Sequence, residues 1–179
     1  MTEIEREKTY LAAFLPDDLD EENSEIISDV YIPEAADHAN LRLRHKGDAY
    51  HITKKEPIDG SDSSRQNEHT IMLTKAEYEA LAACSQKTFT KRRYYYSIDG
   101  VQAEIDVYLE KLAGLVVIDF EFTNDQELEA FSPPTMCLVG VTQDAVIAGG
   151  KLAGRSYEDI RHALEAYGYR PLVKKGEKE

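Results

Sequence analysis

The sequence has no tryptophan and only two cysteines, Cys84 and Cys137, in 179 residues. These two cysteines lack the close spacing of metal ligands, and they are too few for a disulfide-dense secreted domain. No apolar run approaches the roughly 20 residues that span a bilayer, and the acidic N-terminus lacks the apolar core of a signal peptide. We therefore expect a cytoplasmic protein with reduced cysteines and no membrane partner.

Basic residues are also in the minority, since 21 lysines and arginines stand against 34 acidic residues and give a formal net charge of −13. Nucleic-acid-binding surfaces normally carry a basic patch, so we expect no nucleic-acid partner. A basic pocket in the interior remains compatible with this charge, because net charge does not describe local fields. The length fits a single domain, which we expect over residues 1–173, followed by a disordered tail at 174–179.

Several short segments of the chain carry charged residues at every second position. Glu3, Glu5 and Glu7 would share one face of a β-strand, because alternate side chains of a strand point the same way. The same spacing returns in four later segments, at Arg42 and Arg44, Lys91 and Arg93, Glu104 and Asp106, and Asp119 and Glu121. On a half-exposed sheet such charges would simply face water. Strands segregated by the sign of their charge are instead what a site for a metal–polyphosphate complex needs, with one basic and one acidic wall.

Apolar and β-branched alternation, bounded by turn residues, predicts the strands of an antiparallel sheet. We expect them at residues 3–14, 25–32, 40–44, 50–55, 65–73, 87–97, 101–109 and 115–122, with an Asp99-Gly100 hairpin turn. Helices are expected at 75–83, 125–131 and 157–167, the first and last opened by capping boxes, while 140–153 is ambiguous. The buried helical positions should be Tyr78, Leu81, Ile160, Leu164 and Tyr167. The fold class is therefore α+β, mostly antiparallel β.

An ordered set of short motifs resembles the CYTH domain, a family also called the triphosphate tunnel metalloenzymes. The motifs are MTEIER at 1–6, LRLR at 41–44, Thr53-x-Lys55, Ser64-Arg65, Lys91-x-Arg93-Tyr94, Glu104-x-Asp106 and Asp119-x-Glu121-Phe122. Each motif alone is weak, but the order of all of them is specific. The resemblance implies a closed eight-stranded, tunnel-like antiparallel barrel with a charged interior and flanking helices.

The resemblance also implies an activity, that of a divalent-metal-dependent triphosphate hydrolase using Mg²⁺ or Mn²⁺, with inorganic tripolyphosphate as the leading substrate. Alternatives within the family are a class IV-like adenylate cyclase and a thiamine triphosphatase. A further alternative is a non-catalytic module that binds polyphosphate or a nucleotide. The sequence leaves open the substrate, the metal, the catalytic competence of the site and whether the protein forms a homodimer.

Carried over residue by residue, the resemblance assigns roles to charged residues of the expected interior. The catalytic residues would be Lys8, Arg42, Arg44, Lys55 and Glu104. The substrate-binding residues would be Lys8, Arg42, Arg44, Lys55, Arg65, Lys91 and Arg93. The metal ligands would be Glu3, Glu5, Asp106, Asp119 and Glu121.

Two departures from the family pattern bear on turnover and substrate choice. The family has a lysine two residues after the second glutamate, where this chain has Glu7, with Lys8 one residue later. Either Glu5 and Glu7 take the metal role, or a β-bulge turns Lys8 to the interior. After Arg65 the family has acidic residues in phase, whereas this chain has Asn67 and His69, with Glu68 out of phase.

Overall fold

The computed structural model of the protein describes residues 2–60, 62–98 and 100–174, with side chains from Ile4 onward. Asp99 of the expected hairpin turn and residues 175–179 of the expected tail lie outside this range. Lys174 is described, and its Nζ donates a hydrogen bond to Glu21 at 2.8 Å. Within the described residues, no helix combines the length and the apolar character needed to cross a membrane.

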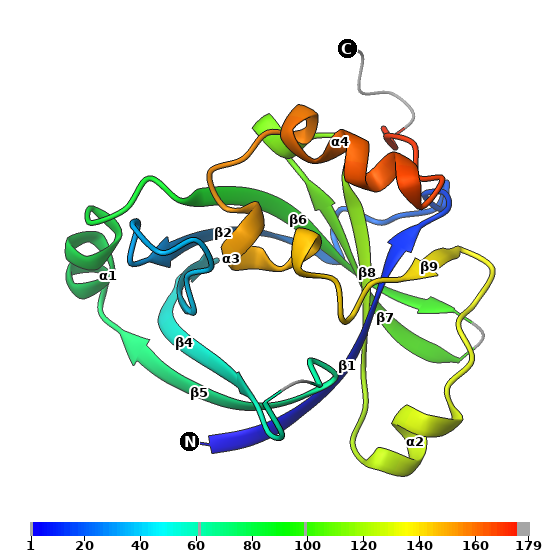
Figure 1. The fold of residues 1–179 in the computed structure, drawn as a ribbon, viewed down its shortest axis with the longest axis horizontal. Coiled ribbons are helices and arrows are strands. Elements are labelled where there is room, and N and C mark those ends of the chain that lie inside the picture. Colours follow the sequence, from blue (N-terminus) through cyan, green and yellow to red (C-terminus); the bar gives the residue numbers. More distant parts are fainter. Residues whose placement is uncertain (1, 61, 99, 175–179) are drawn as a thin grey trace.

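Eight antiparallel strands close into a barrel, as expected (Figure 1). They are β1 (Thr2–Ala12), β2 (Ser24–Ile32), β3 (Leu41–Lys46), β4 (Ala49–Pro57), β5 (Arg65–Leu73), β6 (Thr88–Ile98), β7 (Val101–Tyr108) and β8 (Val116–Glu121). Their order is β5-β4-β3-β2-β6-β7-β8-β1, and pairing of β1 with β5 closes the ring. A ninth strand, β9 (Cys137–Gly140), was not expected and pairs with the end of β1.

Strand β1 closes the barrel by changing partners along its length. Residues 2–6 pair with β5, from Thr2 opposite His69 to Arg6 opposite Arg65. Residues 7–11 then pair with β8, from Glu7 opposite Glu121 to Leu11 opposite Val117. The first half of β1 therefore joins one edge of the sheet and the second half joins the other, so the chain's opening motif bridges the seam of the barrel.

The expected helices are present as α1 (Lys75–Ala82), α2 (Asp125–Ala130) and α4 (Tyr157–Ala166), with the short α3 (Gly149–Leu152) in the segment left ambiguous. Both capping boxes form, at Thr74 with Glu77 and at Ser156 with Asp159. In Figure 1, α1 and α2 lie at opposite edges of the barrel, whereas α3 and α4 lie together in the upper part of the view.

The expected burial of helical side chains was partly wrong. Ile160 and Leu164 of α4 are buried, but Tyr167 is 38% exposed because it follows the last turn of the helix, where its hydroxyl bonds Asp144. Tyr78 and Leu81 of α1 are only half-buried. Helix α1 stands at the rim of the barrel, where Tyr78 contacts the rings of Tyr50 and His45, and has no core to enter.

Two apolar clusters surround the charged part of the interior. One covers the outer face of β1, β6, β7 and β8, where residues such as Ile105, Ile118 and Phe120 pack under the segment that contains Phe131 and Met136. The other fills one end of the barrel itself. It joins inward-pointing residues of five strands to α3 and α4, including Leu11, Tyr31, Phe89, Tyr108, Val117, Ile147, Leu152, Ile160 and Leu164. The same strand faces therefore change from charged to apolar along the barrel.

Gly149 and Gly150 let α3 press against this apolar end. A Cβ atom at Gly149 would stand 1.9 Å from the hydroxyl oxygen of Tyr31, and one at Gly150 would stand 2.2 Å from the carbonyl oxygen of Ala39. Separations this short are far below van der Waals contact, so no side chain fits at either position. The glycine-rich stretch after residue 147 is thus needed for close packing of α3.

Tyr169 should be a strong contributor to stability. Its buried hydroxyl accepts a hydrogen bond from the Val116 N–H at 2.8 Å and donates one to the Gly114 carbonyl at 2.7 Å, tying the C-terminal segment to the start of β8. Tyr169→Phe leaves the Val116 N–H without this partner, and we expect a loss of roughly 1–3 kcal/mol in the free energy of unfolding. Urea unfolding measures it. The matched control is Tyr167→Phe, which removes an exposed hydroxyl; an equal loss in both variants would contradict the prediction.

A charged cavity inside the barrel

A cavity of about 800 Å³ lies inside the barrel. All eight barrel strands contribute alternate residues to its lining, which is the period of two expected for one face of a strand. Its floor is the apolar cluster at the closed end, where Tyr31, Phe89, Tyr108, Val117 and Ile147 reach the lining. The upper walls are charged.

The charges separate into two walls according to strand order. Acidic residues lie on four consecutive strands, namely β7, β8, β1 and β5, which carry Glu104, Asp106, Asp119, Glu121, Glu5, Glu7 and Glu68. Basic residues lie on β4, β3 and β6, which carry Lys55, Arg42, Arg44, Lys91 and Arg93. Asp29 on β2 is an acid among the basic strands. The expected division into a basic and an acidic wall is therefore present.

Asp29 and Arg44 neutralise each other in the basic wall. Arg44 donates two hydrogen bonds to the Asp29 carboxylate, Nε to Oδ1 and Nη2 to Oδ2, both at 2.7 Å. Burial alone would raise the pKa of Asp29, but the guanidinium of Arg44 outweighs it and holds this pKa below its usual value. Arg44 is in this way committed to a protein carboxylate.

Arg93 and Lys91 are committed to the acidic wall in the same manner. Arg93 donates two hydrogen bonds of 2.7 Å to Asp106, contacts Glu104, and lies 3.5 Å from Asp119. Lys91 donates to the second oxygen of Asp106, whose side chain is 1% exposed. Burial would raise the pKa of Asp106, but these two cations lower it well below its usual value. Asp106 therefore has no free oxygen to offer to a metal.

Arg42 differs from these cations. Its side chain lines the cavity, its Nε is buried without a hydrogen-bond partner, and no carboxylate of the described residues lies within ion-pair distance. Arg42 as a whole is half-buried, but a buried guanidinium nitrogen without a partner is costly, because its lost hydration is not replaced. Arg42 is consequently the interior cation best prepared to receive an anion that enters the cavity.

Four carboxylates of the acidic wall, Glu7, Glu104, Asp119 and Glu121, carry pKa values above their usual range. Burial raises the pKa of Glu7 to about 7 despite the lowering by Lys55, and the neighbouring Glu5 and Asp119 add to the increase. Burial, followed by neighbouring carboxylates, also raises the pKa of Asp119 and Glu121. Burial likewise raises that of Glu104. The wall thus holds more negative charge than its resident cations offset.

Lys8 and Arg65 were expected in the interior, and the structure contradicts both expectations. Lys8 pairs with Phe120, whose side chain belongs to the outer cluster, and no bulge turns it inward. Its ammonium lies instead 5.7 Å from the centre of the Phe131 ring. Arg65 pairs with Arg6 across the seam, and both side chains reach outward to Asp125, at 2.9 and 3.0 Å.

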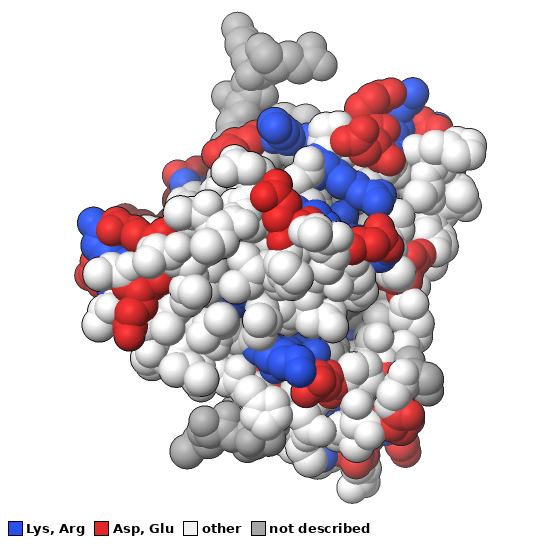
Figure 2. All heavy atoms as spheres, turned by 60° about the vertical axis from the view of Figure 1, so that its left-hand side comes forward, with Lys and Arg blue, Asp and Glu red and all other residues white. Residues whose placement is uncertain are grey.

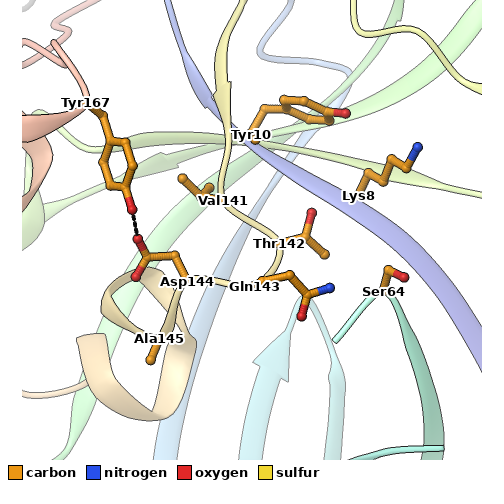
Figure 3. A pocket seen from close by; sticks show the side chains of 10 residues that line it. Lys8, Tyr10, Ser64, Val141, Thr142, Gln143, Asp144, Ala145 and Tyr167 are labelled. Carbon is orange, nitrogen blue, oxygen red and sulfur yellow. Dashed lines mark hydrogen bonds between the residues drawn. The ribbon is translucent and has the colours of Figure 1, made fainter. Parts of the chain in front are cut away.

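Lys8 borders a second pocket, of about 580 Å³, that adjoins the charged cavity. Figure 3 shows Lys8 and Tyr10 on β1 at one side of it, with Thr142 and Gln143 at its centre. Asp144 and Tyr167 lie at the far side and are joined by a hydrogen bond. This pocket shares the segment 142–145 with the lining of the charged cavity, but Lys8 itself is not among the residues that line the cavity.

Sequence reasoning did not place Asp29 or Glu68 in the cavity lining, and it gave Glu7 only as an alternative metal ligand. Glu68 was considered out of phase because Arg65 was taken as inward; once Arg65 points outward, Glu68 points inward. Glu7 follows from strict alternation after Glu5. The backbone of Glu3 continues β1 opposite Glu68, but its side chain lies outside the described part of the chain.

The acidic wall has the donor chemistry of a hard divalent cation, because carboxylate oxygens suit Mg²⁺ and Mn²⁺. Among the described histidine, cysteine, aspartate and glutamate side chains, no group of three lies close enough to hold a metal on its own. Mg²⁺ in proteins is often held by one or two carboxylates, with water and substrate phosphate completing its shell. One or two carboxylates of the acidic wall could supply such an incomplete set.

The outer surface offers no comparable concentration of charge on the face drawn in Figure 2. On that face acidic and basic side chains lie side by side in several places, and uncharged side chains cover much of the rest. The separation of charge by sign is thus a property of the cavity.

Comparison with known proteins agrees with this geometry. The CYTH domain model matches residues 1–163. An inorganic triphosphatase of Nitrosomonas europaea is 33% identical over 146 residues, which are 80% of this chain and 91% of that protein. A solved structure of the inorganic triphosphatase NE1496 has a TM-score of 0.58 at 26% identity, covering 83% of this chain and 93% of that chain.

A putative adenylate cyclase from Bacillus halodurans has a TM-score of 0.56 at 17% identity, covering 90% of this chain and 97% of that chain, and this likeness concerns the fold alone. The family match spans nearly the whole barrel and includes both walls of the cavity. The chain belongs to the CYTH domain family.

Proposed function

We propose that this protein is a divalent-metal-dependent hydrolase of triphosphates, with inorganic tripolyphosphate as its substrate. The proposal is carried by two features that occur together in one cavity. Arg42 is an interior arginine without a carboxylate partner among the described residues, and carboxylates of the acidic wall such as Glu7 and Glu121 have raised pKa values. A polyphosphate would satisfy the arginine, and a cation would offset the carboxylates. The name of the Nitrosomonas relative, an inorganic triphosphatase, supports the same substrate class.

In this proposal Arg42 and Lys55 bind phosphate oxygens, because charge-assisted hydrogen bonds from cationic donors suit such oxygens. Arg44, Lys91 and Arg93 contribute positive charge to the cavity but stay bound to Asp29 and Asp106. Glu5, Asp119 and Glu121 would hold the metal, with Glu3 added by the resemblance. A divalent cation bound there would neutralise phosphate charge and orient the substrate.

Hydrolysis joins a water oxygen to the terminal phosphorus while the bridging P–O bond breaks, giving orthophosphate and diphosphate from tripolyphosphate. The water proton passes to an interior carboxylate, and Glu104 is the base implied by the resemblance. Glu7 is a second candidate, since a general base works best with a pKa near the working pH and burial raises its pKa to about 7. The basic wall holds the leaving diphosphate.

An organic triphosphate is the second candidate substrate, as for an adenylate cyclase or a thiamine triphosphatase. The cavity of about 800 Å³ lies in the size range of sites for small organic ligands, and Tyr31, Phe89 and Tyr108 line its floor. Aromatic rings at that depth would suit a base or a thiamine ring. A non-catalytic polyphosphate-binding module would use the same basic wall without turnover.

One experiment separates these functions. Purified protein is incubated with tripolyphosphate, ATP or thiamine triphosphate, each with Mg²⁺, Mn²⁺ or a chelator, and the products are identified. The proposal expects orthophosphate and diphosphate from tripolyphosphate in the presence of metal. Cyclic AMP from ATP, turnover of thiamine triphosphate alone, or binding without turnover would each overturn it in favour of the corresponding rival.

Truncation of Arg42 should mainly weaken triphosphate binding, whereas truncation of Arg44 should mainly lower the stability of the protein. Arg42→Ala should weaken triphosphate binding by about 10- to 100-fold, corresponding to one lost charge-assisted contact of about 1.5–3 kcal/mol, with little loss of stability. Arg44→Ala leaves Asp29 buried and unpaired, so it should cost about 3–5 kcal/mol in the free energy of unfolding. Calorimetric titration and urea unfolding of both variants measure this, and equal effects on binding and stability would contradict it.

Glu121 should act on the metal rather than on the phosphate. Its carboxylate lies beside Glu7 at the seam of the barrel, and burial with neighbouring acids raises its pKa. We expect Glu121→Ala to raise the Mg²⁺ or Mn²⁺ concentration needed for half-maximal hydrolysis, and excess metal to restore part of the rate. The control is Glu158→Ala, which removes an equal charge from the exposed face of α4. An activity loss that metal does not reverse would exclude this role.

Glu7 should make stability depend on pH in a defined window. Burial raises its pKa from 4.5 to about 7, so the folded protein keeps a proton there that the unfolded chain has lost. The contribution of Glu7 to stability therefore falls as pH rises from about 4.5 to about 7. Relative to the unmodified protein, Glu7→Gln should gain up to about 3 kcal/mol between pH 5 and pH 8 in the presence of a chelator. A difference independent of pH, measured by urea unfolding, would show that Glu7 titrates normally.

A further inference from the structure

Lys55 is the interior lysine that contacts carboxylates on two acidic strands, as the arginine Arg93 does at the other end of the acidic wall. Its ammonium contacts Glu5 and lies 3.7 Å from Glu7 and 3.7 Å from Glu68. These carboxylates come from β1 and β5, whereas Lys55 comes from β4, so the lysine side chain reaches across from the basic wall. Its neighbour Lys54 points outward, is 44% exposed and pairs with Glu56.

We propose that Lys55 is an exchangeable internal cation. In the protein without ligands it occupies carboxylates that take part in metal binding, and entry of a divalent cation releases its ammonium to bind the triphosphate. This inference rests on the proposed function, because it assigns an order of events to that same site. Lys55 would then be a positioning residue for the metal and a binding residue for the substrate at different stages.

The local charge balance favours such an exchange. A single ammonium stands among three carboxylates, which leaves negative charge in excess at this part of the wall. Moreover, Oε2 of Glu5 is buried without a well-formed hydrogen bond, even though the Lys55 ammonium touches it. A divalent cation carries twice the charge of the ammonium and accepts several oxygen ligands at once. It therefore offsets the wall better than lysine does.

Arg93 holds the other acidic cluster and is much less suited to exchange. Its guanidinium makes two parallel hydrogen bonds to Asp106, a buried carboxylate that Lys91 also engages. Planar bidentate pairs of this kind are geometrically fixed, whereas an ammonium is a point charge on a flexible stem. Of these two clusters, the one around Lys55 therefore combines a movable cation with carboxylates that pair with no second cation among the described residues.

The released ammonium has a destination next to it. Arg42 on β3 lies opposite Thr53 on β4, and Lys55 follows Thr53 by two residues on the same face. Lys55 and the unpaired Arg42 are consequently neighbours on the basic wall. A triphosphate bound by Arg42 would offer phosphate oxygens to a lysine freed from Glu5 and Glu7.

The exchange makes metal and triphosphate bind cooperatively. Metal binding frees a cation for the phosphate, and phosphate binding draws that cation away from the metal's carboxylates. Because coupling between two ligands is reciprocal, each should tighten the binding of the other by the same factor. With a non-exchangeable lysine, by contrast, the metal would compete with it for the carboxylates whether or not phosphate is present.

The test measures the affinity of the protein for Mn²⁺ in the absence of triphosphate. The electron paramagnetic resonance signal reports the concentration of free Mn²⁺ during the titration. Lys55→Met should bind Mn²⁺ about tenfold more tightly than the unmodified protein, because the competing ammonium is gone. Lys54→Met removes the same charge from the outer face of β4 and should leave Mn²⁺ affinity unchanged. Lys55→Arg keeps a cation in place and should bind Mn²⁺ no more tightly than the unmodified protein, which tests the idea even if Lys55→Met does not fold.

A second measurement tests whether the binding of Mn²⁺ and the binding of triphosphate are coupled. In the unmodified protein, a non-hydrolysable imido analogue of tripolyphosphate should tighten Mn²⁺ binding by about tenfold, and Lys55→Met should abolish most of that gain. Unchanged or weaker Mn²⁺ binding by Lys55→Met, or tighter binding by Lys55→Arg, would overturn the exchange. Hydrolysis of tripolyphosphate without any effect of Lys55 on Mn²⁺ would leave the proposed function standing alone. Tighter Mn²⁺ binding by Lys55→Met, without triphosphate turnover by the unmodified protein, would support the exchange at Lys55 and overturn the proposed hydrolase function.

Discussion

Paired charges inside the barrel are the feature on which the rest of the structure depends. Moving an ionised carboxylate or guanidinium out of water is expensive, and only a well-oriented opposite charge repays that cost. The pairs Asp29–Arg44 and Asp106–Arg93 meet this requirement with two hydrogen bonds each. They lie on β2–β3 and β6–β7, so they also connect neighbouring strands. The remaining charges are less completely balanced, and those are the ones left to interact with a ligand.

The apolar end of the barrel makes this charged region possible. Leu11 pairs with Val117 next to the Thr9–Asp119 pair on the same inward faces of β1 and β8. Because α3 and α4 pack against such residues, the core that stabilises the fold lies beneath the cavity and does not compete with it for space. Gly149 and Gly150 allow α3 to approach Tyr31 and Ala39 closely enough to complete that floor. The charged walls can then remain incompletely neutralised without carrying the stability of the whole barrel.

Alternation in the sequence was enough to predict the eight barrel strands, their antiparallel pairing and the separation of charge by sign, but not β9. It failed where the phase of a strand depended on its partner. Arg65 follows a loop, so nothing local indicates that it points outward; that is decided by pairing with Arg6 across the seam. Lys8 was allowed inward only through a bulge, and regular pairing with Phe120 removes that option. The apolar floor was also beyond prediction, because it joins Leu11 to residues of α4 that are distant in sequence.

The net charge of −13 and the proposed binding of a polyanion are reconciled by the strand order. The field at a site depends mainly on the charges within a few ångströms, while distant surface charges are screened by solvent and salt. Arg42 lies on a stretch of wall where β4, β3 and β6 carry the cations, and the acids stand across the cavity on the other four consecutive strands. An anion that enters meets the basic wall at close range, yet it cannot neutralise the acidic wall. That residual imbalance, and not the overall charge of the protein, is the physical reason for expecting a cation to enter together with the phosphate.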